Sequence, residues 1–290
     1  MLLLGGFTER DVSLLSGKEV KDALIRLGHE VYEFDIKTQD LCLAPLEKFD
    51  IIFNSLHGGV GENGIVQSIC EIKNIPYTGS NVLASALAMN KVLAKKVFSM
   101  DGINTPEGIV SNTRNIIENK PFTRPYVIKP IDGGSSLGVN IIYKETDLNK
   151  IKSSSSEVMI EKYIKGREIA VAVIGNKVIG MIEIDYPDRF YDYNAKYKSN
   201  KNNYIIPSNL DMALKKKIEK YALSAHKAIG CKGITRSDFI ISEEANDKVY
   251  LLEINTLPGL TRHSLVPKIA NNAGITFDKL ISMILKDALR

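Results

Sequence analysis

The sequence is poor in the features of secreted, zinc-binding or membrane proteins. Its 290 residues include only three cysteines, which lie far apart and form no C-x-x-C pair (Cys42, Cys70 and Cys231). This spacing argues against a disulfide framework and a structural zinc site. No apolar run approaches the roughly 18 residues of a membrane span, and "MLLL" is too short for a signal peptide. We therefore expect a soluble, cytoplasmic protein with reduced thiols and no membrane partner.

A large surplus of charge is also missing. The formal net charge is +4, charged residues make up 25% of the chain, and the longest lysine-arginine run is Lys215 to Lys217. We therefore expect no nucleic-acid partner. A mild positive surplus can still concentrate anionic substrates such as nucleotides in a cleft.

The order of apolar runs and breaks predicts an α/β protein with a change of architecture along the chain. In residues 1–84, strand runs such as "MLLLGG" and "DIIFNSL" alternate with helical spacing, which is typical of a doubly wound parallel sheet. From about 125, strand follows strand, which favours antiparallel sheets. Helices are expected over 90–100, 211–229 and 276–289. We predict an N-terminal domain over 1–84, a central subdomain over 85–180 and a C-terminal subdomain over 181–290.

One glycine-rich stretch, "HGGVGENG", contains the spacing G-x-G-x-x-G from Gly59 to Gly64. A dinucleotide site also needs an acidic residue about 20 positions later to hold the ribose. Between Ile72 and Met100 there is no Asp or Glu. The motif therefore indicates a loop that a ligand can approach closely, with His57 beside it, and not an NAD site.

A second loop, Gly133 to Ser136, follows the strand "YVIK", which ends at Lys129. In a Walker A loop the lysine comes after the glycines, so this is a different arrangement. A lysine before a flexible loop between two strands suits a lid folded over phosphates. An ordinary hairpin with a flexible tip explains the same pattern equally well.

Two later strands carry charged residues at a spacing of two. Arg236 and Asp238 in "ITRSDFII", and Glu253 and Asn255 in "KVYLLEIN", each project from one face of a strand. Ionised groups in apolar strands are costly unless they are paired or bind a cation. Two carboxylates and an amide oxygen suit Mg²⁺. The alternative is a buried salt bridge from Arg236 to Asp238 or Glu253.

Taken together, these segments resemble the ATP-grasp fold, and almost the whole chain resembles the D-alanine–D-alanine ligase family. The quoted stretches are joined by others in the same order, namely "LLGGFTERDVSLLSG", "PYTGSNVLASALAMNK", "EKYIKGRE", "FYDYNAKY" and "NTLPGLTRHSLVP". The resemblance implies that the two later parts form a two-subdomain ATP-grasp fold. It also implies ATP and D-alanine as substrates, a homodimer, and two Mg²⁺ ions that Mn²⁺ could replace.

The resemblance assigns roles by position. It implies ATP contacts at Lys91, Lys129, Lys162 and Glu168, and contacts with the adenine of ATP at Glu161 and Ile164. It implies metal ligands at Asp238, Glu253 and Asn255. Glu9 matches the residue that holds the first D-alanine ammonium, in a hydrogen-bonded set with Ser135 and Tyr197. Arg236 and the Gly259 N–H match the groups that face the reacting carbonyl. Contacts on the amino-acid side are implied at His57, Lys196, Ser264 and Leu265.

The implied reaction joins two D-alanines through an acyl phosphate, for peptidoglycan precursor synthesis. A D-alanine–D-lactate ligase, or another carboxylate–amine ligase, is the alternative within this class, although Tyr197 favours the dipeptide. A protein that binds the nucleotide without turnover would be expected to have a broken catalytic set, and the set is present.

Three departures from the family pattern stand out. Asn90 and Asn194 replace the acidic residues usual at their positions, for which we expect altered loop packing and retained chemistry. The first strand begins almost at Met1, and we expect this to weaken the edge of the N-terminal sheet.

Overall fold

The N-terminal part of the chain is a small parallel sheet with helices. The computed structural model describes residues 1–7, 9–36, 41–112, 115–116, 122–151, 157–185, 203–205 and 210–290. The first elements are β1 (Leu2–Gly5), α1 (Arg10–Arg26), β2 (Glu33–Ile36), β3 (Phe53–Asn54) and α2 (Ile65–Ile72). The three strands are parallel in the order β2-β1-β3, which confirms the predicted architecture. β1 is therefore the central strand, and our expectation that its shortness weakens a sheet edge was wrong.

Two short helices lead into an antiparallel sheet of four strands. The helices are α3 (Val82–Met89) and α4 (Lys91–Met100), and the strands are β4 (Gly108–Asn112), β5 (Tyr126–Pro130), β6 (Asn140–Ile142) and β7 (Glu157–Lys162). The strand order is β4-β7-β5-β6. Asn90 caps α4, because its side-chain oxygen accepts a hydrogen bond from Leu93 N at 3.0 Å. Asparagine and aspartate are both good N-caps, so this departure from the family pattern keeps the helix start intact.

The remaining strands form a five-stranded antiparallel sheet in the order β10-β9-β8-β11-β12. They are β8 (Gly166–Ile174), β9 (Lys177–Asp185), β10 (Asn203–Ile205), β11 (Ile234–Ser242) and β12 (Val249–Asn255), and they are accompanied by α7 (Met212–Ile229), α8 (Leu265–Asn272) and α9 (Phe277–Ala288). The predicted helices over 211–229 and 276–289 are confirmed. The boundary predicted at 180/181 would divide β9, and the sheets favour a boundary near residue 165.

Both faces of the five-stranded sheet are buried, because alternate residues of β8 belong to different hydrophobic clusters. Ile169, Val171 and Val173 pack in one cluster with α4 and α7 residues. Ala170 and Ala172 pack in another, which combines α8 and α9 with β1 and α1. The two ends of the chain therefore share one core, and Arg26 of α1 also pairs with Asp278 of α9 at 2.6 Å.

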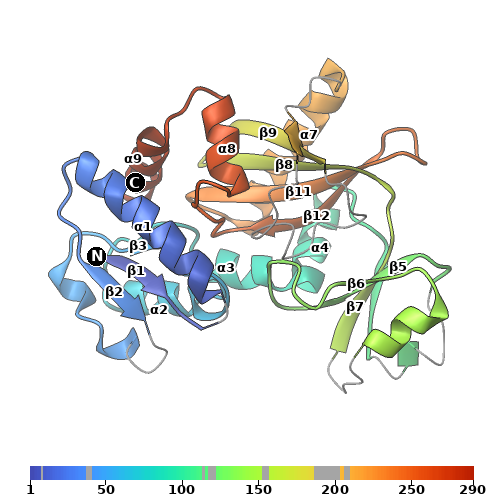
Figure 1. The fold of residues 1–290 in the computed structure, drawn as a ribbon, viewed down its shortest axis with the longest axis horizontal. Coiled ribbons are helices and arrows are strands. Elements are labelled where there is room, and N and C mark those ends of the chain that lie inside the picture. The colour runs from blue at the N-terminus through green and yellow to red at the C-terminus, as the bar shows by residue number, and fades with distance from the viewer. Residues whose placement is uncertain are drawn as a thin grey trace.

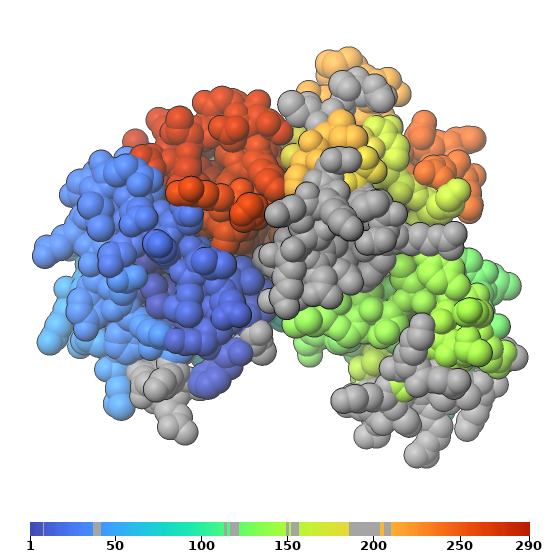
Figure 2. Space-filling model, viewed as in Figure 1, coloured from blue at the N-terminus to red at the C-terminus, as the bar shows by residue number. Residues whose placement is uncertain are grey.

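The overall shape follows from the hydrophobic core that the two ends of the chain share. In Figure 1, α1 lies beside α9, and the four-stranded sheet stands at the other end of the molecule. Figure 2 shows the blue N-terminal part in contact with the red C-terminal part. The green central part lies at the lower right, away from the blue part. None of the described helices combines the length and apolarity that a bilayer crossing requires.

Gly166, at the start of β8, has no space for a side chain. A Cβ there would lie 1.9 Å from the carbonyl oxygen of Ile241 on the neighbouring strand β11. Because backbone in a sheet cannot move away cheaply, we expect Gly166→Ala to lower the free energy of unfolding by about 2–3 kcal/mol. Urea unfolding measures this. The exposed neighbour Lys165 provides the control Lys165→Ala, which should change stability by less than about 0.5 kcal/mol. Equal stability of the two variants would contradict the prediction.

Candidate active site

A cleft lies between the four-stranded sheet and three strands of the five-stranded sheet. It encloses about 1040 Å³ of empty space, including space open to solvent. Its walls come from β5, β6 and β7 on one side and from β8, β11 and β12 on the other, with the 133–139 loop and Lys91 of α4. Concave sites with apolar walls and a few convergent charges are typical of small-molecule and cofactor binding.

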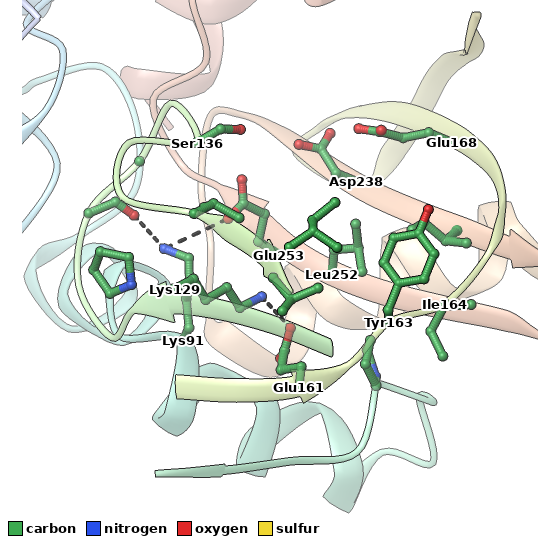
Figure 3. A pocket seen from close by; sticks show the side chains of 18 of the residues that line it. Lys91, Lys129, Ser136, Glu161, Tyr163, Ile164, Glu168, Asp238, Leu252 and Glu253 are labelled. Carbon is green, nitrogen blue, oxygen red and sulfur yellow. Dashed lines mark hydrogen bonds and ion pairs between the residues drawn. The ribbon is translucent and has the colours of Figure 1, made fainter. Parts of the chain in front are cut away.

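All six residues predicted to contact the nucleotide line this cleft. They are Lys91, Lys129, Glu161, Lys162, Ile164 and Glu168. In Figure 3, Lys91 and Lys129 lie toward one end of the cleft, and Tyr163 and Ile164 lie toward the other. The structure thus separates Lys91 and Lys129 from Tyr163 and Ile164 along the length of the cleft.

The cationic end is built around one buried carboxylate. Glu161 on β7 has a side chain only 3% exposed, and Lys129 on β5 lies 2.6 Å from one of its oxygens. Lys95 on α4 contacts the other oxygen. Lys91 lies 3.8 Å from the Glu253 carboxylate and donates a hydrogen bond to the Gly133 carbonyl. With three lysines around two carboxylates, this part of the site favours an anionic ligand.

Burial changes the acid–base properties of these lysines. It lowers the pKa of Lys129 to about 8; the nearby Glu253 carboxylate partly opposes the effect, and Lys91 adds to it. Burial and, next in size, the charge of Lys129 also lower the pKa of Lys95. The two lysines therefore compete for positive charge, and each favours its ammonium form more when the other moves away.

The acidic strand pair also faces the cleft. Asp238 pairs directly with Glu253, and Arg236 with Asn255, in the register of β11 and β12. Asp238 and Glu253 line the cleft. The predicted cross-strand cluster is therefore present. Arg236 also donates to both carboxylate oxygens of Asp238 at 2.8 Å, so the salt bridge that was the alternative interpretation is formed as well.

The donor set fits a divalent cation. Asn255 Oδ1 accepts a hydrogen bond from Leu257 N at 2.8 Å, and Asp238 accepts from Arg236, but each of these oxygens has a second lone pair. Carboxylate and amide oxygens are what Mg²⁺ prefers. Among the described residues no group of three His, Cys, Asp or Glu converges as a metal site. The expected metal ligands are Asp238, Glu253 and Asn255, and only two of them belong to these four residue types. They would therefore not form such a group.

A smaller hollow adjoins the cleft. It shares Lys91, Gly133, Gly134 and Glu253 with the cleft and adds Glu62 and Asn255. Ser135 donates a hydrogen bond to Glu9 across this region, so the 133–136 loop is tied to the start of α1. Ser135 and Ser136 both have positive φ, 53° and 57°. The structure thus confirms the predicted contact between Glu9 and Ser135 in this conformation.

The glycine stretch beside His57 packs internally. Gly61 leaves no room for a side chain, since a Cβ would lie 2.5 Å from Leu56 Cβ. The Gly61 carbonyl accepts hydrogen bonds from Asn54 and Gln67, both at 2.9 Å. These glycines therefore permit a tight turn before α2.

His57 links three distant segments. The residue is 5% exposed, and its Nε2 lies 3.1 Å from Ser16 Oγ. Leu260 N donates to the same hydroxyl at 3.3 Å, and His57 Nδ1 lies 3.8 Å from Glu62. His57 also lines a small cavity with Leu257, Pro258 and other residues. It is thus positioned to hold the 257–260 segment against α1.

Gly259 and Ser264, two of the residues predicted to face the substrates, lie close together. A Cβ on Gly259 would meet Ser264 Oγ at 2.7 Å, and that hydroxyl accepts from Thr261 N at 3.2 Å. Leu265 begins α8 and is buried in the core. Its side chain is therefore positioned by packing.

Some residues lie outside the predicted set or outside the described chain. Lys196, Tyr197 and Asn194 fall within 186–202, which the structure does not describe. Sequence reasoning missed Lys95, whose signal is its position one helical turn after Lys91. It also missed Tyr163 and Leu252 in the cleft wall.

The chain is similar to proteins of one family along nearly its whole length. The family description "D-ala D-ala ligase C-terminus" matches residues 99–286, and "D-ala D-ala ligase N-terminus" matches residues 40–80. The D-alanine–D-alanine ligase of Pelagibacter ubique is 47% identical over 99% of this chain and 97% of that protein. The ligase of Trichlorobacter lovleyi is 43% identical over 98% of this chain and 92% of that protein.

Solved structures of ligases are also similar to this chain along nearly its whole length. The D-alanine–D-alanine ligase of Bacillus anthracis in complex with ATP superposes with a TM-score of 0.85 at 34% identity, over 100% of this chain and 96% of that chain. The VanG D-Ala:D-Ser ligase of Enterococcus faecalis superposes with a TM-score of 0.82 at 26% identity, over 99% of this chain and 98% of that chain.

Proposed function

Since this chain belongs to the D-alanine–D-alanine ligase family, we propose that the cleft between its two antiparallel sheets holds ATP and that the adjoining hollow holds D-alanine. The family reaction is the ATP-dependent, ADP-forming ligation of two D-alanines to D-alanyl-D-alanine, a peptidoglycan precursor. One observation carries the assignment of the site. Six residues from four segments, predicted as nucleotide contacts, line a single cleft together with Asp238 and Glu253.

The first step creates the acyl phosphate. A carboxylate oxygen of one D-alanine attacks the γ-phosphorus of ATP, and ADP leaves. Both reactants are anions, so Lys91 and Lys129 serve by neutralising phosphate charge at the cationic end of the cleft. Asp238, Glu253 and Asn255 would hold Mg²⁺, which when bound supplies further neutralisation of the phosphate charge. Glu9, tied to Ser135, is placed to hold the ammonium of this D-alanine.

The second step forms the peptide bond. The amine of the second D-alanine attacks the acyl carbonyl, a tetrahedral oxyanion forms, and phosphate leaves. We assign the stabilisation of that oxyanion to Arg236 and the Gly259 N–H. Ser264 and Leu265 are proposed near the second D-alanine, with His57 on the same side. We assign Lys196 and Tyr197 to the substrate site on the family resemblance.

Phosphate release tests the proposed function. With ATP and Mg²⁺, D-alanine should give phosphate and D-alanyl-D-alanine, identified by mass, and L-alanine should not. D-Lactate and D-serine, each added with D-alanine, test the ester and D-alanyl-D-serine alternatives. Phosphate release without D-alanine dependence would refute the substrate assignment. We also infer a homodimer in the cytoplasm, as the family resemblance suggests, and light scattering tests the dimer.

The lowered pKa of Lys129 predicts a pH dependence of ATP binding. Burial lowers this pKa to about 8, so the ammonium that attracts phosphate dominates below pH 8 and is lost above it. We expect ATP affinity, measured by calorimetry without D-alanine, to fall about tenfold per pH unit above that value. Lys129→Arg keeps its charge, so the decline should disappear. Constant affinity of the unaltered protein up to about pH 9.5 would contradict this prediction.

A further inference from the structure

Lys95 is a buried cation that none of the proposed steps uses. Its side chain is 8% exposed, and its Nζ contacts the carboxylate of Glu161. The Pro106 carbonyl accepts a second, longer hydrogen bond from it at 3.5 Å. Lys95 is not among the residues that line the cleft, whereas Glu161 and Lys129 are. Lys95 therefore approaches Glu161 from outside the cleft lining.

Glu161 thus has a cation on each side. In the register of the sheet, Val127 of β5 lies opposite Glu161, so Lys129, two residues further along, is a diagonal neighbour on the same face. Lys129 reaches one carboxylate oxygen from the cleft side, and Lys95 contacts the other. A buried carboxylate with a single cationic partner would lose its compensation if that partner moved.

We propose that Lys95 is a positioning residue that keeps Glu161 compensated while Lys129 turns from that carboxylate to the phosphates of ATP. The inference rests on the proposed function, because the anion that attracts Lys129 is the nucleotide. Lys129 faces Lys91 and Lys95 of α4, Glu161 of β7 and Glu253 of β12. Of the two cations on Glu161, only Lys129 lines the cleft, so only Lys129 is free to exchange partners.

The test compares Lys95→Met with Lys95→Arg and with Lys96→Met, which alters the exposed neighbouring lysine on α4. In Lys95→Met, Lys129 is held by Glu161, and the KM for ATP should rise on the order of tenfold, with the KM for D-alanine and the melting temperature little changed. Lys95→Arg should restore most of the ATP affinity, and Lys96→Met should behave as the unaltered protein. A folded Lys95→Met protein with an unchanged KM for ATP would overturn the proposal.

A double variant keeps the proposal testable if Lys95→Met fails to fold. Lys95→Met/Glu161→Gln removes both buried charges, and it should bind ATP as Glu161→Gln alone does, because Lys95 acts only through that carboxylate. A further tenfold loss in the double variant would overturn the inference. ATP affinity is measured by calorimetry without D-alanine, so this result is independent of whether the unaltered protein ligates D-alanine.

Discussion

Replacing Arg236 with alanine is expected to lower kcat for D-alanyl-D-alanine formation by about 10²–10³ while the fold is retained. Arg236 lies on β11 opposite Asn255, beside the proposed metal ligands, and its guanidinium is held by two hydrogen bonds to Asp238 at 2.8 Å. A donor fixed in this way needs no reorganisation when the oxyanion forms. Its removal should therefore affect kcat more than the KM for ATP. Quenched-flow measurement of peptide formation separates this step from phosphate transfer.

Arg167 provides a matched control for this substitution. It lies on the neighbouring strand β8 and holds Glu183 with two hydrogen bonds of 2.9 and 2.6 Å, in the same forked arrangement. Arg167→Ala removes an equivalent ion pair that lies outside the cleft lining, and its kcat should stay within about threefold of the unaltered value. If both variants lost activity equally, the effect would come from the sheet and not from the carbonyl site.

Asp238→Asn should raise the Mg²⁺ concentration for half-maximal activity by at least about tenfold and lower kcat by about 10². Asp238 and Glu253 are directly paired across β11 and β12, so the loss of one charge halves the anionic part of the proposed metal site. Titration of phosphate release with Mg²⁺ measures this, and Mn²⁺ binding by electron paramagnetic resonance gives a readout that needs no turnover.

The exposed Glu243 serves as the control for charge. Its carboxylate pairs with Lys165 at 3.1 Å, and both side chains are at least half exposed. Glu243→Gln should leave the Mg²⁺ titration unchanged. Unaltered Mn²⁺ binding by Asp238→Asn, in protein of normal stability, would remove Asp238 from the metal site.

The sequence predicted the parts of the structure that depend on local pattern. The sequence pattern predicted the helices α4, α7 and α9, and alternation at a spacing of two predicted that Asp238 and Glu253 would face one site. Their direct pairing depends on register, which residue spacing alone does not specify. The register also shifts between Asp238 and Phe239, which leaves Leu252 as an extra residue in β12. Such a bulge redirects a side chain, here into the cleft wall, and it has no local signature in "VYLLEIN".

Contacts between segments far apart in the sequence could not be predicted from residue spacing either. The burial of Lys95 depends on where β4 and β7 place Pro106 and Glu161 around α4, and a lysine in "NKVLAKKVF" looks like part of a solvated helix face. The contact of Ser16 with His57 and Leu260 N joins positions up to 244 residues apart. The Glu9 and Ser135 pair was foreseen only through family resemblance, because residue spacing carries no information across 126 positions.

The core shared by the two ends of the chain has a consequence for biosynthesis. Leu2, Leu4 and Val20 pack in one cluster with Leu280, Ile281 and Ile284. While the chain emerges from the ribosome, the first strand and helix are made long before their packing partners exist. Their apolar faces lack these partners until α9 has left the ribosome, so this cluster closes late, through contacts of high sequence separation. In the growing chain, the N-terminal part is therefore the segment that chaperones would have to protect longest.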